Sequence, residues 1–372
     1  MAAYTLRYQT RQTRPSSGKR RGTGAVPLSI ICTRMQDLKE KLAMMNINRR
    51  SVLKGAAAVA AAASGSLSLA QAKIQLIYSD TIPEQDRRAK LLLQEFGPGI
   101  GPEFDLKAYW SASLFKQGTE LLAMQRGNLD MGNLSVPDFQ RQIPAWGIVG
   151  APYIFRDIEH MQKVFASDVG QQLFKMSEDQ LGIKVLNVNY IGMRHVNLKP
   201  KKKVMTPADM VGMRLRMPSG EGWQFVGTAL GANPTPIPYT EVYTALQTGA
   251  IDAQDNPLPN NKDMKFHEVT TQIVLTGHMV NFNLLSIRKS KWDTLSAAQK
   301  DRMQKAATAF GNGVTQQSKK EEEELIAYFK AQGLDVYTPN LKAFRDYALD
   351  MTQKSKYIKE WTPGMLERIN AL

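Results

Sequence analysis

Two segments of this chain repeat one pattern, a helix that a glycine ends and a strand that follows it. One segment reads TELLAMQRGNLD (residues 119–130) and the other TEVYTALQTGAID (residues 240–252). In both, Thr-Glu opens an apolar helix and Gln-x-Gly-x-(Leu/Ile)-Asp leads into the strand, because glycine readily adopts the left-handed conformation that ends helices. The pattern predicts two α/β lobes of similar construction. Coincidence in a common helix–strand turn is the alternative.

Polar residues follow both predicted strands. The stretches GNLSVP and QDNPLP occupy corresponding places after the two copies. Ligands of open α/β sheets bind beyond the carboxyl ends of the strands. We therefore expect a cleft shared by the two lobes, with Asn133 and Ser135 on one side and Asp255 and Asn256 on the other.

The net charge of +14 is concentrated at the N-terminus. Residues 1–72 hold 12 of the 48 Lys+Arg and 2 of the 34 Asp+Glu, so the remainder carries only +4. A strongly basic chain would suggest nucleic acid or an anionic membrane as a partner. The small charge of the remainder argues against nucleic acid.

The basic leader has the pattern of an export signal. The pair Arg49 and Arg50 precedes an alanine-rich apolar run and an Ala-Gln-Ala cleavage sequence, and resembles a twin-arginine signal of bacterial secretion. A buried alanine-rich helix is the alternative. We expect residues 1–72 to be removed and a periplasmic mature chain to begin near Lys73, with Met45 as a second possible start.

The mature chain would be an α/β protein that rests on its core. The only cysteine, Cys32, lies in the leader, so no disulfide would stabilise the remaining 300 residues. Short apolar runs alternate with helical patterns, which indicates α/β architecture. Strands are predicted at 74–80 and 182–192, and a helix after Pro83.

Two helix starts carry capping signals. Thr206 followed by Pro207 predicts a one-turn helix. Ser296 and Gln299 form a capping box that opens a long helix, which we expect to end at Gly333.

The stretch GMRLRMPSG sets two arginines among apolar residues. On a strand, Arg214 and Arg216 would share one face and the residues between them the other. A guanidinium matches a carboxylate, and its burial is costly, so an arginine near a core usually has a fixed anionic partner or awaits an anionic ligand. A solvated strand face or a salt bridge is the alternative for either residue.

The chain shows no recognised catalytic motif. Its four histidines lack metal-site spacing, and there is neither a G-x-S-x-G nor a Walker A sequence. We expect a binding protein without catalytic residues, metal or cofactor, rather than an enzyme.

The stretches KPKKKVMTPADMVGMRLRMP and LGANPTPIPYTEVYTALQTGAIDAQDNPL resemble the DctP-type solute-binding proteins of tripartite ATP-independent periplasmic (TRAP) transporters. The likeness extends from about Ile74 to about Thr338. It implies an α/β, two-lobed periplasmic binding protein, type II-like with mixed sheets, whose lobes are joined by hinge strands near 193 and 281 and braced by the long helix. The implied division is 73–193 plus 282–320 for lobe I, and 194–281 plus 321–372 for lobe II.

The resemblance also implies roles for single residues. The family's carboxylate-binding arginine matches Arg216, a second family arginine matches Arg194, and Arg214 has no family role and should lie at the cleft rim or in a salt bridge. Family members often have glutamate where this chain has the shorter Asp255. The candidate ligand-binding residues are Arg216, Arg194, Asn256, Tyr239, Asp255, Ser135, Asn133 and Gln117.

The implied function is the capture of an organic acid and its delivery to the membrane subunits of a TRAP permease. The polar residues near the cleft suit a polyhydroxylated acid, so we expect a sugar acid such as a uronate ahead of a C4-dicarboxylate or a 2-oxo acid. The alternatives are an exported enzyme that acts on an acidic sugar and the ligand-binding subunit of a periplasmic sensor.

Overall fold

The computed structural model describes residues 72–372, and the predicted export signal lies outside this range. Within it, nine strands form one mixed sheet in the order β2-β1-β3-β8-β4-β7-β5-β6, with β9 paired to β8. The strands are β1 (Ile74–Ser79), β2 (Phe104–Tyr109), β3 (Met131–Leu134), β4 (Ile183–Leu198), β5 (Arg214–Met217), β6 (Asn233–Pro236), β7 (Ala253–Pro257), β8 (Gln272–Arg288) and β9 (Asp335–Tyr337). The helices are α3 (Arg87–Leu91), α4 (Gly97–Gly99), α5 (Glu120–Gln125), α6 (Val136–Gln140), α7 (Ile158–Ala166), α8 (Asp168–Met176), α9 (Glu221–Ala229), α10 (Val242–Thr248), α11 (Leu258–Asp263), α12 (Lys289–Asp293), α13 (Ala297–Ala331), α14 (Leu341–Lys354) and α15 (Met365–Asn370).

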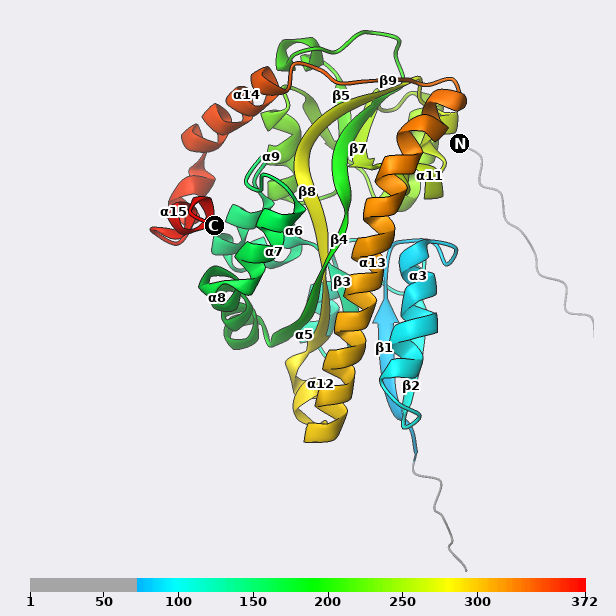
Figure 1. Ribbon diagram of the computed structural model, residues 1–372, viewed down its shortest axis with the longest axis vertical. Helices are drawn as coiled ribbons and strands as arrows, with labels where there is room; N and C mark the ends of the chain where they lie inside the picture. The colour runs from blue at the N-terminus through cyan, green and yellow to red at the C-terminus, as the bar shows by residue number, and fades with distance from the viewer. Residues whose placement is uncertain (1–71) are drawn as a thin grey trace, which may run out of the picture. The chain divides into compact units, whose positions relative to one another are not determined.

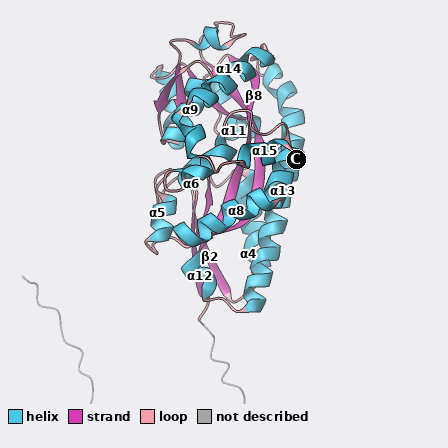
Figure 2. Ribbon diagram, turned by 90° about the vertical axis from the view of Figure 1, so that its left-hand side faces the viewer, coloured by secondary structure: helices cyan, strands magenta, loops and turns pink. Residues whose placement is uncertain are grey.

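Three local predictions from the sequence are confirmed: strand β1, the helix after Pro83 and the single turn that follows Thr206. β1 forms as expected, and the helix after Pro83 begins as α3 and continues through Phe96, with Ala89 and Phe96 in the core. Thr206 caps a single 3₁₀ turn at Pro207–Met210. Helices lie on both faces of the sheet (Figure 2).

The two halves of the sheet are built alike. In one, the parallel strands β2, β1 and β3 meet β8 in antiparallel pairing; in the other, the parallel strands β6, β5 and β7 meet β4 in the same way. β3 and β7 are the strands of the repeated segments. The helices before them, α5 and α10, are followed by Gly127 and Gly249, whose φ angles are +78° and +77°. The repeat therefore marks equivalent places in two lobes.

The long strands β4 and β8 run through both lobes (Figure 1). They pair antiparallel with register shifts, and Gly192 lies opposite Asn281 at one of them. Gly192 has a φ of +127°, and a Cβ there would come within 2.6 Å of the Cβ of Pro257. The hinge strands predicted near 193 and 281 are thus confirmed.

Helix α13 braces both lobes, as predicted. It begins with the capping box at Ser296 and ends before Gly333, whose φ is +87°. Phe310 packs in the core beneath β1, and Phe329 packs in a separate cluster of the other lobe. Figure 1 shows α13 lying along the whole length of the sheet.

The C-terminal segment differs from the expected lobe division. Phe344 of α14 packs on β5 and α9 in lobe II, as expected. Trp361 and Ile369, however, pack in the lobe I core beside Leu173, because the chain returns across the lobes after α14. The expected range 321–372 therefore does not lie wholly on lobe II.

Candidate ligand-binding site

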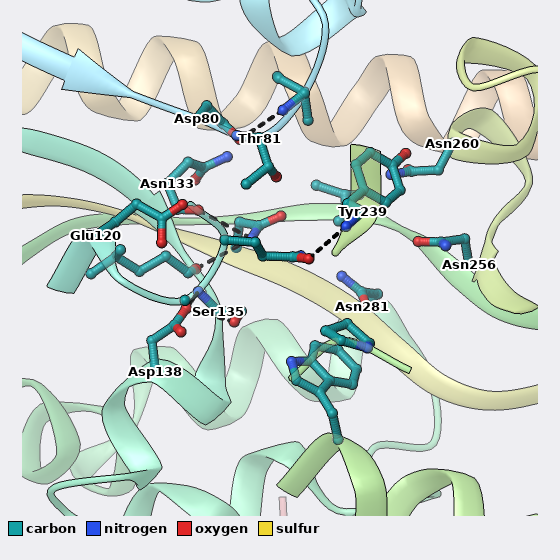
Figure 3. Close-up of a pocket in the computed structure, with 18 of the residues that line it drawn as sticks. Asp80, Thr81, Glu120, Asn133, Ser135, Asp138, Tyr239, Asn256, Asn260 and Asn281 are labelled. Carbon is teal, nitrogen blue, oxygen red and sulfur yellow. Dashed lines mark hydrogen bonds between the residues drawn. The ribbon is translucent and has the colours of Figure 1, made fainter. Parts of the chain in front are cut away.

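A pocket lies where the ends of β1, β3, β5 and β7 meet the middle of β4 and β8. Figure 3 shows side chains from both lobes facing it. Seven of the eight candidate residues line this pocket, and Asp255 does not. The predicted candidates that line it are Arg216, Arg194, Asn256, Tyr239, Ser135, Asn133 and Gln117.

Arg216 is fully buried at the pocket wall (0% exposed). β5 brings it there while Leu215 and Met217 pack in the lobe II core. Its Nε donates to the carbonyl of Ile237 at 2.8 Å, and its Nη2 donates to Oε1 of Gln117 at 3.3 Å. Burial lowers the pKa of Arg216 to about 9, and the charge of Asp255 only partly offsets this. Among residues 72–372 no carboxylate forms an ion pair with Arg216.

Arg214 has a different environment on the same strand. Its Nη2 lies 2.7 Å from Oδ1 of Asp252, and both side chains are partly exposed. It does not line the pocket. The alternative considered for Arg214, a salt bridge, is therefore confirmed.

The two other arginines of the pocket wall already have carboxylate partners. Arg194 lies 2.6 Å from Oδ2 of Asp255 and also donates to Oδ1 of Asn281 at 2.7 Å. Arg88 forms two bonds to Asp86, of 3.0 and 2.6 Å. Of the three lining arginines, Arg216 is the one whose charge has no carboxylate beside it.

Asp255 was expected to contact the ligand, but it does not line the pocket. Asp255 is fully buried and lies between Arg194 and His278, whose Nε2 is 3.0 Å from its Oδ2. Burial opposes the charged carboxylate, but Arg194 and the hydrogen bond to His278 together outweigh it and hold the pKa of Asp255 well below its usual range. Asp255 therefore fixes Arg194 and does not reach the pocket.

Gln117 links the two lobes at the pocket wall. Its Oε1 accepts from Arg216 and also from the backbone N–H of Tyr239 at 2.9 Å. The Tyr239 hydroxyl accepts from Nδ2 of Asn260 at 3.1 Å, and its ring centre lies 5.9 Å from the Arg216 guanidinium carbon. The Tyr239 ring thus borders the space in front of the guanidinium.

Arg141 forms a second link between the lobes, beside the pocket. Its Nη1 donates to the carbonyl of Gly118 in lobe I at 2.6 Å, and its Nη2 donates to the carbonyl of Ser219 in lobe II at 2.9 Å. These contacts join the loops next to Gln117 and Arg216, and hold the lobes together over the cleft.

Sequence reasoning missed several lining residues. Three of them have a buried side-chain oxygen that no described residue bonds: Ser79, Asn260 and Asn283. These oxygens are hydrogen-bond acceptors that the described residues leave unused beside the pocket. Polar residues in otherwise apolar strands and after strand ends were the available signal. The other missed polar or charged residues of the wall are Asp80, Thr81, Arg88, Glu120, Asp138 and Asn281.

Glu120 is the most unusual of the missed residues. It opens α5 at the Thr-Glu start of the first repeated segment and is 6% exposed. No cation forms an ion pair with it among the described residues. Burial, reinforced by the nearby Asp138 carboxylate, raises the pKa of Glu120 to about 8. Glu120 is therefore mostly neutral at pH 7.

No group of three or more His, Cys, Asp or Glu residues within 72–372 is placed to hold a metal ion. No helix of this range is long and apolar enough to cross a bilayer. The pocket wall combines the unpaired guanidinium of Arg216 with amide, hydroxyl and carboxyl groups, a set of groups that can bind a polar acid.

Comparison with known proteins identifies the family. The model of bacterial extracellular solute-binding protein family 7, DctP, matches residues 85–359. The chain belongs to the DctP family. DctP proteins are solute-binding components of TRAP transporters and not enzymes, as the resemblance implied. A twin-arginine signal sequence matches residues 46–65, which confirms the predicted export to the periplasm.

The named relatives include binding proteins for sialic acid, for 2,3-diketo-L-gulonate and for C4-dicarboxylates. The sialic acid-binding protein SiaP of Vibrio cholerae is 35% identical over 261 residues, which cover 69% of this chain and 80% of SiaP. The 2,3-diketo-L-gulonate-binding protein YiaO of Escherichia coli is 31% identical and covers 73% of this chain and 82% of its own.

A solved DctP-type structure has the same fold. A TRAP periplasmic solute-binding protein from Roseobacter denitrificans, solved with 3-deoxy-D-manno-oct-2-ulosonic acid bound, superposes with a TM-score of 0.79. It is 41% identical, and the match covers 80% of this chain and 99% of the other. The two-lobed α/β fold implied by the resemblance is confirmed.

Proposed function

We propose that this protein binds a sugar acid in the pocket, with the ligand carboxylate on Arg216, and delivers it to a TRAP permease. The observation that carries the proposal is the fully buried guanidinium of Arg216 without a carboxylate beside it. Holding a buried charge without a counter-ion is costly, and a ligand carboxylate would supply the counter-ion inside a closed cleft. Two charge-assisted hydrogen bonds would then hold the ligand more strongly than a surface ion pair.

The remainder of the pocket favours a ligand with several hydroxyl groups. The oxygens of Ser79, Asn260 and Asn283 lack donors, and hydroxyl groups would provide them. Asn256 uses Nδ2 to bond Gln254 at 2.6 Å, which leaves its Oδ1 as a further acceptor. A simple C4-dicarboxylate would leave these acceptors unsatisfied and would lack a second unpaired cation.

The relatives indicate which sugar acids to test first. The Roseobacter protein was solved with 3-deoxy-D-manno-oct-2-ulosonic acid, and the Vibrio relative is named for sialic acid. We therefore place 2-keto sugar acids of this size ahead of the uronate that the sequence suggested. Solved proteins of the same fold contain galacturonate and glucuronate, so uronates stay among the candidates.

Thermal-shift measurements with the purified protein test the proposal. The panel is 3-deoxy-D-manno-oct-2-ulosonate, N-acetylneuraminate, galactonate, galacturonate, glucuronate and succinate. A ligand at 100 times its dissociation constant should stabilise the protein by about 2.7 kcal/mol. We expect a sugar acid to give this shift and succinate to give none. A shift by succinate alone, or by no member of the panel, would contradict the proposal.

Delivery to a permease needs a separate experiment in cells. Deletion of the gene for this protein should abolish high-affinity uptake of the radiolabelled acid, and so should deletion of the permease genes. Uptake that survives loss of the permease would contradict the delivery step and leave the binding step intact.

A further inference from the structure

The two sides of the pocket differ in charge. Lobe II supplies the unpaired guanidinium of Arg216 and the amide of Asn256, whereas lobe I supplies the carboxyl groups of Asp80, Glu120 and Asp138. Figure 3 shows these three carboxyl groups together on one side and Asn256 with Tyr239 on the other. A ligand that extends from Arg216 across the pocket therefore brings its far end to carboxyl groups.

The three carboxyl groups differ in the partners they have. Asp80 accepts from the hydroxyl of Tyr78 at 2.7 Å and from two backbone N–H groups. Asp138 accepts from the backbone N–H and the hydroxyl of Ser135 at 2.9 and 2.7 Å. No side chain within the described residues donates to Glu120, and only the backbone N–H groups of Gly118 and of Glu120 itself favour its ionised form. Glu120 is thus the carboxyl group most available to a ligand.

The cations near Glu120 include two guanidinium groups without a carboxylate partner in the described chain: Arg216 at the pocket wall, and Arg141, which bonds the carbonyl of Gly118 two residues before Glu120. α5 packs on β3, which has no charged residue, and on β8, whose two titratable residues both have carboxylate partners. Arg141 contacts the neighbouring loop only through backbone carbonyls. The charged groups of the pocket and of these elements are Asp80, Asp138, Arg88, Arg194, Arg216, Arg141, His278 and Arg288.

We propose that Glu120 is a proton-linked specificity residue, which in its ionised form excludes ligands that carry a second carboxylate at the end remote from Arg216. The inference rests on the proposed function and deepens it, because it concerns the far end of an acid bound to Arg216. An ionised Glu120 accepts hydrogen bonds from ligand hydroxyls, whereas a ligand carboxylate has no proton to donate and repels it. A carboxylate at both ends is therefore accepted only when Glu120 takes up a proton.

The exclusion should depend on pH. Because burial and Asp138 raise the pKa of Glu120 to about 8, the residue is neutral at pH 6 and mostly ionised at pH 9. A dicarboxylate that binds only when Glu120 is protonated should therefore bind about tenfold more weakly at pH 9 than at pH 6. Each pH unit above the pKa lowers the protonated fraction of the carboxyl group about tenfold. Binding of an acid with one carboxylate and a terminal hydroxyl does not require a proton on Glu120.

A pair of sugar acids isolates this effect. Galactonate and galactarate share a six-carbon chain and one carboxylate, and differ in whether the far end is a CH₂OH group or a second carboxylate. We would measure the dissociation constants of both by calorimetry at pH 6 and pH 9. The ratio of the galactarate constant to the galactonate constant should rise about tenfold from pH 6 to pH 9 in the wild type.

The repeated segments provide a matched control variant. Glu241 follows a threonine in the second segment just as Glu120 does in the first, but it is exposed and does not line this pocket. In Glu120→Gln the ratio should no longer change with pH, and at pH 9 galactarate should bind about tenfold more tightly than to the wild type. Glu241→Gln should behave as the wild type does. Melting curves without ligand verify that both variants fold.

The outcomes separate this inference from the proposed function. A ratio that is independent of pH in the wild type overturns the inference, and so does the same rise in Glu120→Gln. It is equally overturned if Glu120→Gln binds galactarate at pH 9 no better than the wild type, whatever the affinity for galactonate. If none of the sugar acids in the thermal-shift panel binds the wild type, the proposed function itself fails and the inference fails with it.

Discussion

Replacing Arg216 by methionine should raise the stability of the ligand-free protein and abolish tight binding. Burial lowers the pKa of Arg216 from its ordinary value to about 9. At about 1.4 kcal/mol per pKa unit, the charge costs the folded protein up to about 5 kcal/mol at neutral pH. The folded pKa of this base is depressed, so the cost is fully present below pH 9 and falls as the pH rises above it. Methionine also removes the bonds to Ile237 and Gln117, so we expect a net gain of about 1–3 kcal/mol.

The same substitution should weaken ligand binding strongly. Removing one partner of a buried ion pair typically costs about 3–5 kcal/mol, because the other charge is left uncompensated. A sugar acid should therefore bind roughly two to four orders of magnitude more weakly to Arg216→Met. The two effects together are characteristic of a residue kept for function at the expense of stability.

The assay is denaturant unfolding of both proteins with and without 3-deoxy-D-manno-oct-2-ulosonate or the panel member that binds most tightly. Arg214→Met is the matched control, because Arg214 is on the same strand but exposed and paired with Asp252. It should leave both the free energy of unfolding and the ligand affinity almost unchanged, because exposed ion pairs contribute little. The reasoning is refuted if Arg216→Met is less stable than the wild type without ligand, or if the ligand stabilises both equally.

Three further predictions concern other parts of the site. Glu120→Gln should match the wild type in stability near pH 5 and exceed it above pH 8 by at least about 1 kcal/mol. The raised pKa of Glu120 makes the wild type lose stability as the pH rises from about 4.5 to 8, and glutamine has no such loss. Equal pH profiles in denaturant unfolding would contradict this prediction. Arg141→Ala removes a link between the lobes and should speed ligand release about tenfold, with little change in association, in stopped-flow experiments; an unchanged release rate would show that the link does not hold the closed form. Gly192→Ala should cost more than about 2 kcal/mol, because the residue has a positive φ and its Cβ would clash with Pro257; a loss below 1 kcal/mol would show that the hinge adapts.

Features encoded in short stretches of sequence were predictable. Thr206 and Ser296 cap helices through neighbouring residues, and Gly127 and Gly249 end helices through their own backbone freedom, so a few adjacent residues suffice to predict them. The position of Arg216 at the pocket wall was predictable because the residue belongs to a short sequence motif of the family. The lobe that receives Trp361 was not predictable, because it depends on where the chain returns after α14.

The partners of the arginines required the tertiary structure. Arg194 and Asp255 are 61 residues apart in the chain, and only the pairing of β4 with β7 brings them to 2.6 Å. The sequence could therefore identify Arg194 and Asp255 as candidates, but it could not show that the two form an ion pair with each other. Arg216 differs because the fold brings one side-chain amide and one backbone carbonyl to it, but no carboxylate.

The repeated segments show most clearly where sequence information ends. The sequence by itself determined that each lobe would contain a Thr-Glu helix start, a glycine stop and a strand that leads to the cleft, because these are local properties of the backbone. Only the tertiary structure decided that Glu120 is buried in the pocket while Glu241 is exposed. The physical reason is that burial, and with it the pKa, depends on the groups that the fold packs around each helix start, such as Asp138 of α6 near Glu120.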